Sequence, residues 1–127
     1  TIKTIQVESN NQRFSVKSNI LYENREDGST KQAIAFAISS TARTVEILAG
    51  TEKIGDCAFC KASNLSSVTF PESLVTIGMD AFYNSGLREL RLPDSLTTIG
   101  DSAFADCHNI VEVTIPDSVT TLGQYTF

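Results

Sequence analysis

A seven-residue phrase occurs four times in this chain of 127 residues. Each copy has a glycine in third place and a phenylalanine in seventh, and the copies begin at Lys53, Thr76, Thr98 and Thr121. Their glycines lie 23, 22 and 23 residues apart. A period of this length is typical of a solenoid, in which one unit cannot bury its apolar face alone and stacks on its neighbours. The repeat therefore predicts a stack of coils.

Apolar residues recur between the phrases on the same register, as do a proline and an acid. The alternating segments with their prolines are Val68-Thr69-Phe70-Pro71, Leu90-Arg91-Leu92-Pro93 and Val113-Thr114-Ile115-Pro116. Alternation sends the apolar side chains to one face of an extended strand, and proline ends the strand because it has no amide to donate. We predict one short strand per coil, a corner at the proline, a bend at the glycine and a short helical turn that carries the phenylalanine. Asp56 or Asp101 would cap that turn.

A stretch near the N-terminus departs from the register. The step from Ile5 to the equivalent Val45 is 40 residues, one period plus 17. The extra segment predicts an antiparallel meander with strands at about 14–16, 20–22 and 33–38, the last two joined by a turn at Asp27-Gly28. We therefore expect one domain over 1–127: the end of an earlier repeat (1–8), an inserted hairpin or meander (9–43) and repeats (44–127). Because both ends interrupt a repeat, we expect a fragment of a longer chain whose last coil leaves apolar surface uncovered.

The repeated residues resemble the BspA-like leucine-rich repeat family, whose unit contains Pro-Asp-Ser-Val, Thr-x-Ile-Gly, x-x-Ala-Phe and x-x-Cys. The likeness is close over about residues 44–127 and weak over 1–8, and segment 14–22 is similar to a hairpin that these proteins insert between repeats. Among the family's cysteines only Cys107 remains, and Leu48 replaces a proline. The resemblance implies a β-rich α/β solenoid, a right-handed leucine-rich-repeat superhelix. It also implies a secreted or cell-surface protein, often bacterial, that binds host proteins or mediates adhesion, with no catalytic motif to transfer.

Charge and hydropathy restrict the partners. Fifteen acids against ten bases give a net charge of −5, and no run of lysines or arginines could neutralise successive phosphates. We therefore expect no nucleic-acid partner. No stretch approaches the 18 or so apolar residues that a membrane span needs, so we expect membrane attachment only through an anchor outside this chain.

The cysteines could carry chemistry. Cys57-Ala58-Phe59-Cys60 is a C-x-x-C motif, and an enzyme component with Cys57 as a reactive thiol is one alternative function. The repeat explains Ala58 and Phe59 as core residues and places both cysteines near the surface. Cys107 is two coils further on, about 10 Å away at strand spacing, which is too far for a shared zinc ion or a disulfide. We therefore predict no metal site and no cofactor, Cys107 as a buried small residue and His108 as a solvated one.

The outward positions of the predicted strands form a more plausible functional surface. Stacked coils would place these residues in one continuous row, and solenoids bind partners through such faces. The alternative is that a sheet face must be polar in any case. The candidate binding residues are Glu46, Thr69, Glu89, Arg91, Glu112 and Thr114. Among these only Arg91 belongs to the residue types that dominate protein interfaces, so we expect modest affinity.

Three functions remain open at this point. The leading hypothesis is a noncatalytic extracellular module that binds protein or glycan at a bacterial cell surface, with an outer-membrane lipoprotein as one form of attachment. The alternatives are a purely structural spacer or assembly segment, with possible end-to-end self-association, and a thiol-dependent enzyme component. All of them rest on Phe59, Phe82 and Phe104 forming one aromatic column inside the stack.

Overall fold

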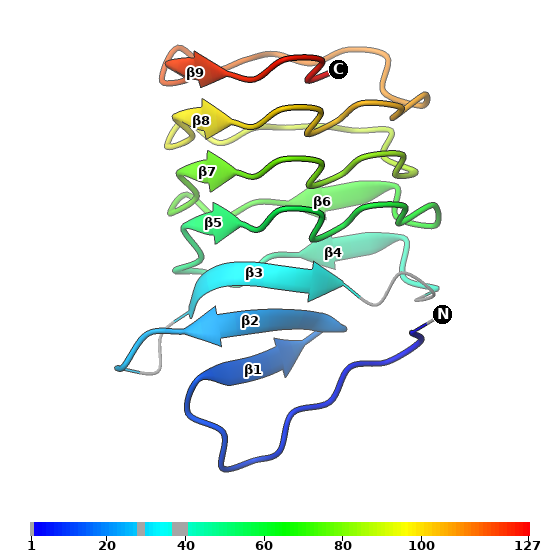
Figure 1. Cartoon of the computed structure of the whole chain (residues 1–127). Helices are drawn as coiled ribbons and strands as arrows, with labels where there is room; N and C mark the ends of the chain where they lie inside the picture. The colour runs from blue at the N-terminus through cyan, green and yellow to red at the C-terminus, as the bar shows by residue number, and fades with distance from the viewer. Residues whose placement is uncertain (1, 28–29, 37–40) are drawn as a thin grey trace.

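The computed structural model describes residues 2–27, 30–36 and 41–127, and within these it contains strands and turns but no helix. The coils stack along one axis, with the meander at one end and the C-terminus at the other (Figure 1). A seven-stranded sheet runs the length of the stack in the order β1 (Phe14–Lys17), β2 (Ile20–Asn24), β3 (Thr30–Phe36), β5 (Lys53–Ile54), β7 (Thr76–Ile77), β8 (Thr98–Ile99) and β9 (Thr121–Leu122). A second sheet behind it contains β4 (Thr44–Glu46) and β6 (Ser67–Thr69). This is the predicted leucine-rich-repeat-like solenoid, and its handedness stays a prediction.

The repeated phrase itself forms a strand, which the sequence analysis did not anticipate. Strands β5, β7, β8 and β9 pair in parallel with an unchanged register, in which Ile54 faces Ile77 and Ile77 faces Ile99. The glycine after each strand lies against the backbone of the preceding coil. A Cβ on Gly100, for example, would lie 2.7 Å from the Met79 nitrogen and 2.8 Å from the Gly78 carbonyl carbon. Glycine is therefore required here for close approach. We name each coil by this residue: the Gly55, Gly78, Gly100 and Gly123 coils.

The segment that carries the phenylalanine is a series of tight turns, so the predicted helical turn is wrong. Alternate amides point in different directions: Cys57 and Phe59 donate to the next coil, whereas Ala58 and Cys60 donate three residues back. Cys57 and Lys61 also have φ angles of 55° and 61°, in the left-handed region. A right-handed helix needs negative φ angles throughout and, after its first turn, amides that bond back along the same segment. The neighbouring coil takes half of these amides, and this prevents a helix.

The predicted cap is also corrected. Asp56 accepts a hydrogen bond at 3.0 Å from the Met79 amide, and Asp101 accepts one at 2.7 Å from the Gln124 amide. Both carboxylates therefore bond to the next coil instead of capping their own turn. The corner serines also link neighbouring coils, because Ser95 and Ser118 donate to carbonyls of the preceding coil at 2.6 Å. Side chains thus add to the backbone pairing between coils.

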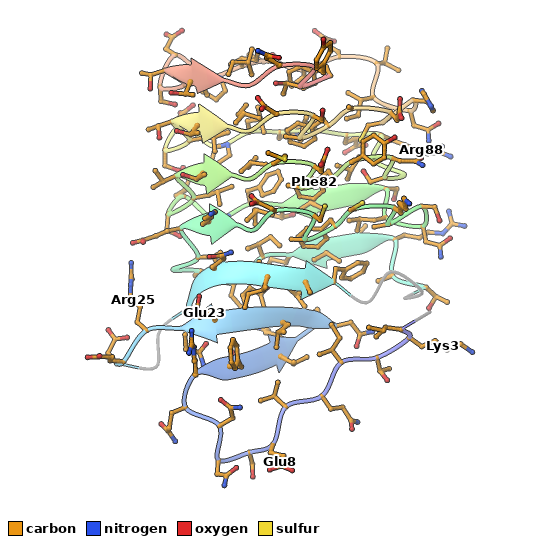
Figure 2. The ribbon with its side chains drawn as sticks, in the orientation of Figure 1. Lys3, Glu8, Glu23, Arg25, Phe82 and Arg88 are labelled. Carbon is orange, nitrogen blue, oxygen red and sulfur yellow. The ribbon has the colours of Figure 1, made fainter. Side chains whose placement is uncertain are left out.

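The predicted aromatic column is confirmed. The rings of Phe59 and Phe82 stack with centroids 4.9 Å apart, those of Phe82 and Phe104 at 5.3 Å, and the planes lie within 8° of parallel. All three side chains are buried, and Phe82 lies near the middle of the stack (Figure 2). Phe36 and Phe127 extend the column at its two ends. Each such pair adds about 0.5–1.5 kcal/mol beyond burial, which stabilises the vertical register of the coils.

The meander is joined to the solenoid through β3. This strand pairs antiparallel with β2 on one edge and parallel with β5 on the other. It is therefore the last strand of the meander and the first strand of the parallel part of the sheet. The buried Tyr22 hydroxyl accepts a hydrogen bond from the Leu48 amide at 3.3 Å. The other coils have proline at this position and no amide to satisfy. The leucine that replaces proline at position 48 therefore has its amide bonded by Tyr22 of the meander.

The last coil leaves apolar surface uncovered, as the interrupted last repeat predicts. Ile115 is 40% exposed, and Leu122 and Phe127 are each 50% exposed. At the opposite end, residues 2–13 form no strand, and Ile2 is exposed. Apolar surface is thus accessible at both ends of the stack.

Candidate binding surface

The predicted row of strand residues lies on one side of the stack, which we call the row side. It comprises β4, β6 and the equivalent segments 89–91 and 112–114. The opposite side, with β3, β5, β7, β8 and β9, is the signature side. The register on the row side stacks Thr44 on Ser67 and Glu46 on Thr69, and a single bridge continues it from Ser67 to Glu89. All six predicted binding residues are exposed: Glu46, Thr69, Glu89, Arg91, Glu112 and Thr114.

Strand formation on the row side fades toward the C-terminus. β4 and β6 pair over three residues, and the next contact is the single bridge at Glu89. In the described chain, no backbone hydrogen bond joins residues 111–115 to the coil before them. One strand per coil was predicted here, so this prediction is right for the first two coils and wrong for the last two. Figure 1 shows β4 and β6 without a successor above them.

Two hollows lie where this pairing fades. One lies between the Gly78 and Gly100 coils and is lined by Thr69, Glu89 and Arg91. The other lies between the Gly100 and Gly123 coils and is lined by Glu89, Arg91, Glu112 and Thr114. Arg91 is shared by both, and it forms no ion pair with any described residue. The structure therefore gathers four of the six predicted residues around one arginine, whereas Glu46 lies two coils away.

The cysteines lie where the repeat predicts. Cys57 is exposed, Cys60 is partly buried and Cys107 is buried, and His108 is exposed. Cys107 donates a hydrogen bond to the Phe82 carbonyl at 3.0 Å, so it is a bonded core residue and not merely a small apolar one. Burial raises the pKa of the Cys57 thiol, and neighbouring Cys60, Asp80 and Asp56 raise it further. A raised pKa lowers the thiolate fraction at neutral pH, which does not favour a nucleophilic role.

Metal ligands do not gather in the described part of the chain. No group of three or more histidine, cysteine, aspartate or glutamate side chains is placed to hold an ion there. In the same residues, no helix has the length and apolar character that crossing a bilayer requires.

A third hollow lies at the edge of the stack and was missed by the sequence analysis. It is lined by polar residues of four successive coils, including Arg43 and Arg88. Arg88 projects from the edge opposite to Arg25 (Figure 2). A signal for it was present in the sequence, because the Gly100 coil is one residue shorter than its neighbours at Gly86. We call this hollow the edge notch.

Comparisons with known proteins agree with the geometry of the stack. Residues 32–127 match the BspA type leucine rich repeat region in six copies, so the chain belongs to this leucine-rich repeat family. A comparison with curated proteins gives no match.

Two solved structures share the fold. A leucine-rich cell surface protein from Faecalibacterium prausnitzii superposes with a TM-score of 0.81 at 28% identity, over 87% of this chain and 30% of that one. The leucine-rich repeat protein of T. pallidum superposes with a TM-score of 0.70 at 19% identity, over 96% of this chain and 66% of that one. This chain thus spans less than a third of the Faecalibacterium protein. Leucine-rich repeats of this family are surface-associated repeat modules, and they are generally noncatalytic.

Proposed function

We propose that this chain is a noncatalytic module of a bacterial cell-surface protein, and that it binds a protein or a glycan through its row side. The observation that carries the proposal is the combination of exposed row residues with two hollows around Arg91. On the row side, the backbone groups of residues 111–115 are not hydrogen-bonded to the coil before them, so hydrogen-bonding capacity is available to a ligand there. Resemblance to a bacterial cell surface protein supports the location.

A structural spacer is the second candidate, and the composition of the row favours it. None of the six row residues is aromatic, and glutamates outnumber the single arginine. Interfaces that bind tightly usually bury Trp, Tyr or Arg anchors. If the row is a spacer surface, its residues serve only to keep the sheet face solvated.

The test is binding of the purified chain to an array of defined glycans and to immobilised gastric mucin, measured by surface plasmon resonance. We expect weak binding that Arg91→Ala reduces at least about fivefold and that Glu46→Ala changes less. Lys17→Ala is the control, because Lys17 is exposed on β1, away from the row. Binding that is absent, or equal in wild type and Arg91→Ala, would contradict the proposal and favour the spacer.

A further inference from the structure

The edge notch is built by a deletion in the repeat. Asn64 precedes Leu65 and Asn109 precedes Ile110, but in the Gly100 coil Leu87 follows Gly86 directly. The shortened segment packs directly against the backbone of the preceding coil, where a Cβ on Gly86 would lie 2.1 Å from the Ser63 carbonyl oxygen. A side chain is therefore excluded at position 86. The missing residue leaves a hollow of about 450 Å³ with Asn64 and Asn109 on either side.

Two arginines line the notch in one column, two coils apart. The Ser66 amide donates to the Arg43 carbonyl at 2.7 Å, and the Arg88 amide donates to the Ser66 carbonyl at 3.0 Å. Arg43, Ser66 and Arg88 are thus stacked at successive coils. Two coil spacings place the two arginine backbones about 10 Å apart, a distance at which both long side chains can lean toward one ligand. Within the described residues, neither arginine forms an ion pair.

The charge of the notch is opposite to that of the molecule. Its only charged lining residues are the two arginines, although the chain carries a net charge of −5. Acids outnumber bases in the hollows around Arg91, at the C-terminal end and beneath the N-terminal segment. Arg88 also borders the hollow whose lining includes Glu89, Asp94 and Glu112. The notch is therefore a local basic site on an acidic protein.

We propose that the edge notch binds the carboxylate or sulfate group of an acidic saccharide. Guanidinium groups form paired hydrogen bonds with such anions, and they remain charged at every physiological pH. Asn109 carries a side-chain amide that can donate to and accept from sugar hydroxyls, and Ser63 adds a hydroxyl at the same edge. The volume lies within the range of small-ligand sites. Without an aromatic ring in the lining, the affinity rests on charge and hydrogen bonds, so it falls as salt rises.

The notch adjoins the row-side hollow at Arg88, and the experiment addresses the notch through its two arginines. The probes are a sulfated heparin tetrasaccharide, its fully desulfated and N-acetylated counterpart, and sodium sulfate, each titrated by NMR and calorimetry at low salt. We expect the sulfated tetrasaccharide to bind more tightly than the other two. Arg43→Gln and Arg88→Gln should each weaken its binding at least about tenfold, because each removes a charge-assisted pair of hydrogen bonds. Lys17→Gln, which removes a positive charge from the exposed end of β1, should leave it unchanged.

A second variant changes the shape and keeps both charges. Insertion of one asparagine between Gly86 and Leu87 restores the 23-residue register and should fill the notch, with loss of binding. Because this insertion could disturb folding, circular dichroism accompanies it, and the two Arg→Gln variants alone decide the proposal. Equal binding in wild type and the Arg43→Gln/Arg88→Gln double variant, or no binding by wild type, would overturn the site. Sulfate ion that binds as tightly as the tetrasaccharide would overturn the saccharide assignment.

Discussion

The two sides of the stack are held together in different ways. On the signature side, parallel pairing passes unbroken from β3 to β9, and serine and aspartate side chains add bonds between coils. On the row side, pairing falls from three residues at β4 and β6 to a single bridge and then to none. The hollows open on the side where pairing falls. The difference shows that the signature side fixes the register of the coils, and the row side is the one that we propose as the ligand-binding side.

The physical reason lies in which residues are required at each level. The signature side places glycine against backbone in successive coils, and a stack of phenylalanine rings follows directly after it. The row side has no comparable steric requirement, because its outward residues are exposed and differ from coil to coil. Beyond the bridge at Glu89, backbone spacing on this side depends on core packing and not on strand pairing. Side chains on this side can therefore change with little effect on the fold.

Hydrogen exchange should show the largest contrast between the two sides. The amides of Gly78 and Gly100 donate to the preceding coil at 2.9 and 2.8 Å, whereas those of Val113 and Thr114 have no such bond. We expect protection of the two glycine amides to exceed that of the other two by about a thousandfold or more, since buried bonded amides exchange through large openings. Exchange measured by NMR at neutral pH tests this. Similar protection on both sides would contradict the contrast.

A comparison of the Gly100→Ala and Thr69→Ala variants tests whether the signature side has a steric requirement that the row side lacks. The added Cβ at position 100 meets backbone atoms that cannot rotate away, so we expect a loss of about 1–3 kcal/mol in the free energy of unfolding. Thr69 is exposed on β6, and its replacement should change stability by less than about 0.5 kcal/mol. Urea denaturation measures both. A loss at position 100 no greater than that at position 69 would show that the close approach is not required.

The sequence could predict the stack because its determinants repeat. Glycine, phenylalanine and proline recur at fixed spacing, and the coil length, the buried residues and the aromatic column follow from them. The second strand of each coil was missed because it is only two residues long and ends at a glycine. The helical turn was wrong because an isolated segment does not reveal that its neighbour takes every second amide.

The candidate sites were less predictable for a related reason. The row residues could be placed by register, but where their coils pair depends on how all the coils pack together. The edge notch arises from an absent residue at Gly86, and a one-residue difference in period does not show which side chains close around it. Arg43 and Arg88 lie 45 positions apart in the sequence, and only the stacking of the coils brings them to the same hollow.

Tyr22→Phe should weaken the junction between the meander and the coils. It removes the acceptor of the partly buried Leu48 amide, and we expect a loss near the lower end of the roughly 1–3 kcal/mol that a buried unpaired amide costs. Burial raises the pKa of Tyr22 above its ordinary value of 10.0, so above that pH the unfolded chain loses this proton first and wild-type stability falls. Tyr22→Phe should abolish the part of the stability loss at alkaline pH that comes from ionisation of Tyr22. Urea denaturation at pH 7 and pH 10.5 measures both effects.

Leu48→Pro in the Tyr22→Phe background is the matched rescue for this junction. Proline has no amide, and the equivalent positions in the later coils are proline. We expect the double variant to regain at least half of the lost stability, because no donor then remains unsatisfied. Equal stability of the single and double variants would assign the loss to ring packing instead of the hydrogen bond.

Cys57 should give the smallest effect, a slow reaction with alkylating reagents. Its raised pKa keeps the thiol protonated at neutral pH, so its alkylation by iodoacetamide should be slower than that of glutathione at pH 7 and should rise as pH increases. After burial, Cys60 is the next contributor to this shift, and Cys60→Ala should therefore lower the pKa and speed the reaction. Peptide mass spectrometry assigns the label to Cys57. Labelling of Cys57 faster than glutathione near pH 6 would instead restore the thiol-dependent alternative, because only a thiolate reacts at that rate.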